Sequence, residues 1–298
     1  MLKNFEALKQ RVLAAKTQKI IALACAEDDA SLEAIRDAVT ELGLGYILIG
    51  DAAKIKETAA KVGFDIDASK IVAADTPENA AEIAVGLVRD GKADILMKGK
   101  LQTGTLLKAV VDKENGIRTG GLMSHIAVLE SPHYHKLIYT TDGGMVTAPD
   151  LEQKRGIIEN SVSFLRALGY DMPKVAALAA VEVVNVKMPE TVDAADLTKL
   201  NQDGEIADCI IEGPLSFDIA ISAESAKIKG ATSQIAGDTD IFLSPDIATA
   251  NIMSKALIYL GQAKMAGCVL GAKAPIVLVS RGASSEEKML SILLTMAV

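Results

Sequence analysis

The chain has 298 residues, half of them hydrophobic, and a formal net charge of −8 at pH 7. A chain of this length exceeds what a single hydrophobic core usually holds, so we expect two lobes. The acidic balance repels DNA, RNA and anionic lipid, so we expect no nucleic-acid partner and no membrane partner. An anionic substrate therefore needs positive groups gathered locally.

The three cysteines, Cys25, Cys209 and Cys268, are odd in number and widely spaced. This pattern fits neither a disulfide framework nor a zinc site. The first 19 residues are amphipathic and lack the continuous apolar stretch of a signal peptide. No run of about 18 apolar residues is present to span a bilayer. We therefore expect a cytoplasmic protein.

Short apolar runs alternate with helical patterns along the chain, which is typical of parallel α/β layers. The strands are predicted at 19–25, 45–49, 70–74, 93–98, 135–141, 174–184, 208–212, 240–243 and 275–280. The helices are predicted at 31–42, 77–90, 104–112, 150–168 and 245–262. Two helix starts carry clear signals, because Thr76 precedes Pro77 and Ser244 precedes Pro245.

No linker of low complexity divides the chain, so a lobe boundary must lie in a short connection. The glycine-rich stretch 142–150 is the best candidate. Because the last strand and helix can return to the first lobe, we expect lobe I to comprise 1–143 plus 266–298. Lobe II then comprises 144–265, and the cleft between the lobes is the expected ligand site.

Several common chemistries have no motif here. A GxGxxG fingerprint, a P-loop, an HExxH metal motif and a GxSxG nucleophile elbow are all absent from the sequence. The nearest approach to a metal motif is His133 with His135, and a pair falls short of the three or four ligands that a protein usually supplies. We interpret this pair as surface or core histidines and expect no metal.

The segment after the last predicted strand is the most informative. In open α/β sheets, ligands bind beyond the carboxyl ends of the strands. Arg281 follows Ser280 at such a strand end, and a guanidinium beside a helix N-terminus makes a strong phosphate site. Glu287, near the helix start, is a candidate general base. The structural alternative is that Ser284 caps the helix and that Arg281 pairs with the acidic residues of the first turn.

A second candidate anion site follows the strand 93–98, where Lys98, Lys100 and Thr103 precede a predicted helix. The alternative is a solvated loop with a capping threonine. Weaker candidates lie at other strand ends and in turn-like segments: Ser124 within 114–124, Asp142 within 141–144, the segment 213–218, and Asp246 and Asn251 in the segment 244–251.

Six segments together resemble the phosphate acetyl/butyryltransferase family. They are ADILMKGKLQTGTLLKAV, TDGGMVTAPDLEQKRGIIENS, AAVEVVNVKMPETVDAADL, EGPLSFDIAIS, AGDTDIFLSPDIATANIMSKAL and LGAKAPIVLVSRGASSEEK. The resemblance runs in order over essentially the whole chain and is strongest to the butyryl-transferring members.

This resemblance implies two α/β lobes of the isocitrate/isopropylmalate dehydrogenase type with a cleft between them. It implies reversible acyl transfer between coenzyme A and inorganic phosphate, with a butyryl or branched acyl chain. The family uses no metal, no tightly bound cofactor and no covalent acyl-enzyme; coenzyme A is a substrate. The two substrates react directly in a ternary complex, so proximity supplies much of the rate. The resemblance also implies a homo-oligomer, a dimer or a multiple of dimers.

The resemblance also assigns roles to individual residues. Arg281 matches the family arginine that binds the phosphoryl group, and Ser280 matches the serine placed near the thiol and thioester. Glu287 stands where the acetyl enzymes carry an aspartate proposed to deprotonate coenzyme A, and its side chain is one methylene longer.

At the other candidate sites the match to the family is partial. The loop with Lys98 and Lys100 replaces a loop of different composition in the acetyl enzymes, so the lysines as anion contacts are inferred from this sequence alone. Asp246 and Asn251 are retained, while Ala250 replaces a family glycine.

Two rival functions use other features of the sequence. A metal-dependent dehydrogenase of the same architecture needs several carboxylates around one ion, and Asp142, Asp218, Asp238 and Asp246 are the available set. A sensor that binds coenzyme A or phosphate without catalysis has no need of both Ser280 and Arg281.

Overall fold

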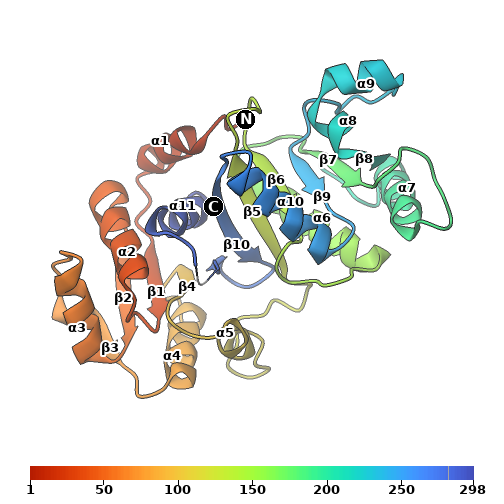
Figure 1. Cartoon of the computed structure of the whole chain (residues 1–298). Helices are drawn as coiled ribbons and strands as arrows, with labels where there is room; N and C mark the ends of the chain where they lie inside the picture. The colour runs from red at the N-terminus through yellow and green to blue at the C-terminus, as the bar shows by residue number, and fades with distance from the viewer. Residues whose placement is uncertain (281) are drawn as a thin grey trace. The chain divides into compact units, whose positions relative to one another are not determined.

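The computed structural model describes residues 1–280 and 282–298, so Arg281 lies outside the described residues. The chain divides into two compact units (Figure 1). We call Met1–Asn4 with Leu122–Met265 the central unit, and Phe5–Gly121 with Ala266–Val298 the terminal unit. Residues 122–143, which the sequence analysis assigned to lobe I, group with the central unit, because the strand that ends at Thr141 pairs with a later strand of that unit.

The terminal unit is a doubly wound α/β layer. Its elements are α1 (Phe5–Ala15), β1 (Ile20–Ala24), α2 (Asp29–Leu42), β2 (Gly45–Gly50), α3 (Ala52–Lys61), a short 3-10 helix (Ala68–Lys70), β3 (Ile71–Ala73), α4 (Pro77–Arg89), β4 (Ile95–Lys98), α5 (Thr103–Val110), β10 (Lys264–Leu270, which enters the unit at Ala266), β11 (Ile276–Val277) and α11 (Ser285–Met296). The strand order is β3-β2-β1-β4-β11-β10. All neighbours are parallel except β10 and β11.

The central unit carries a second, mostly parallel set of strands. Its elements are β5 (Ser124–Glu130), β6 (Ile138–Thr141), α6 (Leu151–Ala167), β7 (Lys174–Leu178), α7 (Pro189–Gln202), β8 (Ile210–Leu215), α8 (Phe217–Ile221), α9 (Ala223–Lys229), β9 (Ile241–Leu243) and α10 (Ile247–Tyr259). The strand order is β5-β6-β9-β7-β8, and only β5 runs antiparallel to its neighbour. The predicted class, α/β with mostly parallel strands in two units, is confirmed.

Helices cover both faces of the terminal sheet, which explains why its central strands are buried and largely apolar. The strand β4 is buried at all four positions, and β1 is buried at all but its first. On one side α2 packs against α3 and α11, and on the other α4 packs against α5 (Figure 1). Two helix layers leave the carboxyl edge of the sheet as the place where polar loops gather.

Helix starts follow the local signals in the sequence closely. Thr76 accepts a hydrogen bond from the backbone N–H of Asn79 at 3.1 Å and caps α4, as predicted. The helix expected from residue 245 begins at Ile247, because Asp246 is its N-cap and accepts from the N–H of Thr249 at 2.7 Å. Caps of this kind fix the first turn of a helix beside the end of the preceding strand.

Each predicted strand and helix corresponds to one in the structure, but the ends of several strands were misplaced, and the helices α1, α3, α7, α8 and α9 had not been predicted. The run 174–184 forms a strand only to Leu178, and its later valines, Val183 and Val184, are exposed in a loop. The run 275–280 pairs only at Ile276 and Val277. The strands β5 and β10 had not been predicted. In the part of the chain that the structure describes, no helix is long and apolar enough to cross a bilayer.

Candidate functional site

The candidate site lies where β1 and β4 end side by side in the terminal unit. The chain after β1 enters α2, and the chain after β4 enters α5, so the two connections diverge at this point. Backbone bonds fix the loop after β4 to the end of β1: the N–H of Gly99 donates to the carbonyl of Ala24, and that of Lys100 to the carbonyl of Cys25, both at 2.8 Å. Such a divergence opens a crevice at the carboxyl edge of the sheet.

A pocket of about 620 Å³ occupies this crevice. Its lining residues come from the loops and helix starts that follow the strands: Asp28, Pro77, Glu78, Lys98, Gly99, Lys100, Leu101, Gln102, Thr105, Val279, Ser280 and Lys288. Of the residues selected from the sequence, Lys98, Lys100 and Ser280 are therefore brought together. Thr103 is the first residue of α5 and lies between two of the lining residues. Glu287 is not among the lining residues, although its neighbour Lys288 is.

The N-terminal ends of four helices converge on this pocket. Asp28 caps α2, Pro77 is the first residue of α4, Gln102 precedes α5, and Lys288 lies in the first turn of α11. Each helix N-terminus carries unsatisfied N–H groups and about half a positive charge. Together with three lysines, this arrangement attracts an anion in a protein whose net charge is negative.

Lys98 is a buried ammonium at the end of β4, with only 5% of its surface exposed. Its Nζ donates to the carbonyls of Gly99 at 3.1 Å and Leu101 at 3.3 Å, so the side chain folds back over its own loop. Gly99 cannot be another residue without a shift, because a Cβ there would lie 2.2 Å from the carbonyl oxygen of Cys25. The loop is therefore fixed both by the hydrogen bonds of the Lys98 side chain and by the close packing of Gly99 against Cys25.

The segment at Ser280 leads into α11. Ser284 caps α11 and accepts from the N–H of Glu287 at 3.1 Å, which confirms the capping interaction considered from the sequence. One carboxylate oxygen of Glu287 is buried without a hydrogen-bond partner among the described residues. Burial raises the pKa of Glu287 above its usual value, and the nearby charge of Lys288 offsets part of that rise.

Three charged residues of the pocket, Asp28, Glu78 and Lys288, were missed by the sequence analysis. Lys288, 6% exposed, donates from Nζ to Oδ1 of Asp28 and to Oγ of Ser31, both at 2.8 Å. This buried ion pair joins the first turn of α11 to the cap of α2. Asp28 follows the first predicted strand, so a search of the residues just after that strand would have selected it. Lys288 lies inside a helix, where that search does not apply.

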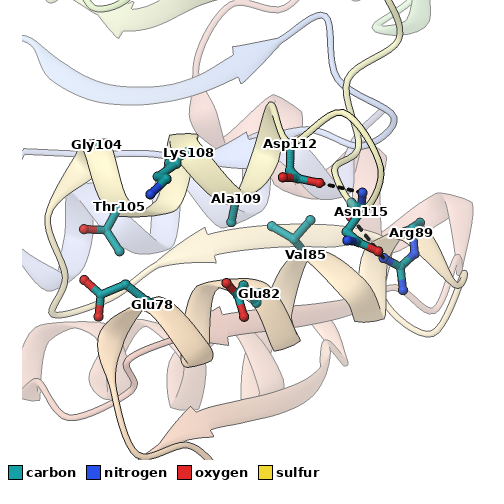
Figure 2. A pocket seen from close by; sticks show the side chains of 10 residues that line it. All are labelled: Glu78, Glu82, Val85, Arg89, Gly104, Thr105, Lys108, Ala109, Asp112 and Asn115. Carbon is teal, nitrogen blue, oxygen red and sulfur yellow. Dashed lines mark hydrogen bonds between the residues drawn. The ribbon is translucent and has the colours of Figure 1, made fainter.

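A second pocket, of about 580 Å³, runs between α4 and α5 and shares Glu78 and Thr105 with the first. Figure 2 shows its lining, with Glu82 and Arg89 on α4 and Lys108 on α5. Arg89 donates to the backbone and side-chain oxygens of Asn115, at 3.1 and 3.2 Å. Among the described residues, Lys108 has no side-chain partner, so it is available to a ligand.

In the central unit, Ser124 and Asp142 hold the backbone together. Ser124 is buried, and its Oγ accepts from Nδ2 of Asn160 on α6 at 3.0 Å. Asp142, 2% exposed, accepts from the N–H groups of His125 at 3.0 Å and of Gly144 and Met145 at 2.8 Å. The carboxylate thereby orders the turn at 142–145 and ties it to the start of β5.

Asp246 and Asn251 lie at the start of α10, beside that turn. Asp246 is the N-cap of the helix, and Nδ2 of the exposed Asn251 donates to the carbonyl of Gly143 at 3.4 Å. The methyl group of Ala250 packs under the turn, because a Cβ at Gly143 would lie 3.4 Å from it. The alanine that replaces a family glycine therefore fills space beneath this turn.

The carboxylates of the rival dehydrogenase hypothesis do not converge. Asp238 pairs with Lys136 and Lys174 and bonds Nε2 of His135 at 3.0 Å, while Asp218 pairs with Lys229 at 3.0 Å. Asp142 is saturated by backbone N–H groups, as described above. Within residues 1–280 and 282–298, no group of three metal-ligating side chains is assembled.

Comparison with known proteins gives a consistent result. Residues 72–296 match the phosphate acetyl/butaryl transferase family. The chain is 45% identical to a phosphate butyryltransferase of Clostridium acetobutylicum over 100% of this chain and 99% of the relative. It is 42% identical to a phosphate acetyltransferase of Thermotoga maritima over 93% of this chain and 94% of the relative.

Solved structures agree with the sequence comparison. A branched-chain phosphotransacylase from Enterococcus faecalis superposes with a TM-score of 0.82 at 32% identity, covering 94% of this chain and 98% of that one. A putative 4-hydroxythreonine-4-phosphate dehydrogenase from Salmonella typhimurium, 15% identical, shares the fold with a TM-score of 0.58 over 94% of this chain and 99% of that one.

The close packing of Gly99 leads to a prediction. In Gly99→Ala, the new methyl group meets two backbone carbonyls, at 2.2 and 2.7 Å, and the loop must move. We expect a loss of about 1–3 kcal/mol in the free energy of unfolding and a fall in turnover of at least about tenfold, because displaced positioning groups lose rate steeply. Urea unfolding and a turnover assay measure both.

Gly104→Ala is the matched control for stability. A Cβ at this helical position meets nothing within 4 Å, so alanine should raise the free energy of unfolding by about 0.5–1 kcal/mol. Equal stability of the two variants would contradict the close packing inferred at Gly99.

Proposed function

The chain belongs to the phosphate acetyl/butaryl transferase family, and we propose on this basis that it transfers a short acyl group reversibly between coenzyme A and inorganic phosphate. The observation that carries the proposal is the pocket ringed by Lys98, Lys100 and Lys288 at the start of four helices. A phosphoryl group and a thiolate are both anions, and such a pocket stabilises either one.

The reaction proceeds by direct attack within a ternary complex. A phosphate oxygen attacks the thioester carbonyl, the C–S bond breaks, and coenzyme A leaves as a thiolate. In reverse, the thiolate attacks the acyl phosphate and inorganic phosphate leaves. Proximity of the two bound substrates lowers the barrier, because orientation alone is worth about 7–11 kcal/mol in favourable cases.

We assign three catalytic residues to this reaction. Arg281 binds the phosphoryl group, and Ser280, which lines the pocket, lies near the reacting thiol and thioester. Glu287 accepts the thiol proton. One of its oxygens is buried without a partner among the described residues, and burial raises the pKa of Glu287, which makes the carboxylate a stronger base.

The acyl group we propose is butyryl or a branched chain of similar length. Support comes from the C. acetobutylicum relative, named for butyryl transfer, and from the E. faecalis structure, named for branched chains. One methylene changes discrimination by only about 1–3 kcal/mol, so neighbouring chain lengths should react more slowly rather than be excluded.

Coenzyme A extends beyond the reacting thiol, and the pocket between α4 and α5 is where we place the rest of it. The two pockets share lining residues, so a long ligand can pass from one to the other. Lys108 offers its ammonium to a phosphate of the nucleotide (Figure 2). No resident cofactor is needed for this chemistry.

In the central unit, Ser124, Asp142, Asp246 and Asn251 remain our proposed substrate-binding residues. Asn251 is the exposed member, with an amide oxygen and a second N–H available to a ligand. Asp142 and Asp246 act through the backbone that they order, and Ser124 acts through the side chain of Asn160.

We propose that the protein is a homo-oligomer built from dimers, and that α10 forms the contact. Ile252 and Tyr259 are 68% and 81% exposed and lie on one face of this helix by their spacing, and the C-cap residue Leu260 is 85% exposed. A large apolar face of this kind is unusual on a monomer, and a second copy of the same face covers it with twofold symmetry.

We also propose that the protein is cytoplasmic. The three cysteines are free and buried, which fits the reducing conditions of the cytoplasm.

The decisive test of function is a substrate panel. We would mix the protein with phosphate and acetyl-, propionyl-, butyryl-, isobutyryl- or isovaleryl-coenzyme A and follow free thiol with a thiol reagent. We expect phosphate-dependent release that is fastest with one four- or five-carbon chain. Folded protein that releases no thiol from any member removes the acyltransferase assignment.

The same assay applied to Arg281→Ala serves as the control for the site. Loss of a preorganised charge partner should lower turnover by roughly 10²-fold or more. Near-normal turnover of this variant would refute the role given to Arg281 while leaving the overall reaction intact.

Glu287 predicts a pH dependence. As a base it must be ionised, so in the direction of thiol attack kcat/KM should fall as pH drops through its raised pKa. Glu287→Gln should lower kcat by about 10²–10⁴-fold and remove this acidic limb, leaving a profile set by the coenzyme A thiol. An unchanged limb in the variant would assign the base to another group.

Oligomerisation can be tested through α10. Light scattering should give the mass of a dimer or of a multiple of dimers. Ile252→Glu places a charge on the apolar face and should shift the protein toward monomers. Met172→Glu, at another exposed apolar residue of the central unit, is the matched control and should not. A monomeric wild-type mass would contradict the proposal.

A further inference from the structure

Among the described residues, the ion pair between Lys288 and Asp28 leaves one N–H donor of Lys288 and one carboxylate oxygen of Asp28 without a hydrogen-bond partner. A lysine ammonium has three N–H donors, and two of them go to Oδ1 of Asp28 and Oγ of Ser31. Oδ1 of Asp28 also accepts from the N–H of Ser31 at 2.9 Å, whereas Oδ2 is buried without a partner among the described residues. Both residues line the anion pocket.

A buried carboxylate oxygen without a partner is costly, so it indicates a missing donor. The ligand that satisfies both groups must offer an acceptor to the ammonium and, next to it, a proton to the carboxylate. Hydrogen phosphate has this combination, because its P–O⁻ and P–OH groups occupy neighbouring corners of one tetrahedron.

We propose that Lys288 and Asp28 together bind inorganic phosphate in its protonated form, the ammonium donating to a P–O⁻ oxygen and Oδ2 of Asp28 accepting from the P–OH group. The inference deepens the proposed function and rests on it. It assigns to this pair the selection of phosphate over tetrahedral anions that carry no proton.

The charge state of Asp28 suits this role. Desolvation by burial acts to raise the pKa of Asp28, but the hydrogen bonds from Lys288 and Ser31 outweigh it, so the pKa lies below its usual value. Asp28 is therefore an anion at neutral pH, so its carboxylate accepts hydrogen bonds and donates none. Any ligand oxygen that faces it must carry a hydrogen.

The amides and the thiol of the pantetheine arm fit this pair less well. The amides of the pantetheine arm have N–H and C=O groups that point in opposite directions, since peptide-like amides are trans. One such amide cannot serve an adjacent donor and acceptor at the same time. A thiol offers only one weak donor and no comparable acceptor.

The first test uses the wild-type protein and a set of anions at constant ionic strength and neutral pH. Sulfate and monofluorophosphate are tetrahedral dianions without a proton, whereas arsenate retains one. Arsenate should replace phosphate as a substrate. Sulfate and monofluorophosphate should inhibit with Ki values at least about tenfold above the KM for phosphate, as a hydrogen bond to a charged group is worth that much.

The second test is Asp28→Asn, which keeps the cap of α2 and an oxygen for Lys288. The amide nitrogen now donates where the carboxylate accepted, so the site should favour unprotonated anions. We expect the ratio of Ki for sulfate to KM for phosphate to fall about tenfold or more, with the KM for acyl-coenzyme A unchanged within about twofold. Asp51→Asn, at the cap of α3 outside this pocket, is the matched control and should leave the ratio unchanged.

The outcomes separate this inference from the proposed function. Phosphate-dependent thiol release by wild-type protein establishes the reaction in the same assay. With that reaction present, equal binding of phosphate, sulfate and monofluorophosphate overturns the role of the pair. The role of the pair is also overturned if Asp28→Asn changes the KM for acyl-coenzyme A and leaves the KM for phosphate unchanged. If Asp28→Asn fails to fold, the wild-type anion series still decides.

Discussion

The parallel pairing of β1 with β4 is the constraint on which the candidate site depends. These two strands are neighbours in the sheet but far apart in the sequence, so the chain leaves them in different directions. The two backbone hydrogen bonds from the loop after β4 hold that loop against the end of β1. A glycine is required at 99 because the two strand ends come within contact of each other there.

The positive electrostatic character of the pocket follows from the same arrangement of strands and helices. The helices α2, α4, α5 and α11 begin at the crevice with their N-terminal ends, and a protein with a net charge of −8 thereby makes a region favourable to anions. Burying lysines is unfavourable unless their charge is matched. Lys98 is stabilised by carbonyl oxygens of its own loop, and Lys288 by the carboxylate of Asp28. The two arrangements differ, because the carbonyl groups that Lys98 contacts are neutral, whereas Lys288 is paired with the negative charge of Asp28.

The sequence predicts the architecture well because buried parallel strands and helix caps leave local signals. The apolar run at β4 and the Thr76–Pro77 start of α4 needed no tertiary information. The errors arise where tertiary contacts decide. The run 174–184 is uniformly apolar, yet pairing partners exist only as far as Leu178. Lys288 joins the pocket only because α11 packs on α2, a contact that no spacing in the sequence reveals.

The same distinction applies to the candidate site residues, because local sequence finds strand ends but does not show which way a side chain faces. Strand-end loops predicted Lys98 with Lys100, and Ser280, as parts of two candidate sites. The structure brings all three into one pocket, since parallel strands place their carboxyl ends at one edge. Asp142 was selected by the same criterion, but its oxygens face backbone N–H groups of its own turn, so a strand-end acid does not necessarily face a ligand.

The pairing of opposite charges in the pocket is a compromise between affinity and selectivity. A site made only of lysines and helix N-termini binds any small dianion, and sulfate resembles phosphate in size and charge. Asp28 lowers the attraction for all of them, but it returns a hydrogen bond only to an anion that carries a proton. Selectivity for phosphate over sulfate depends on the difference between the two binding free energies. A group that weakens the binding of sulfate more than that of phosphate therefore improves this selectivity. The unused oxygen of Asp28, costly while nothing binds, is then the feature that distinguishes the two anions.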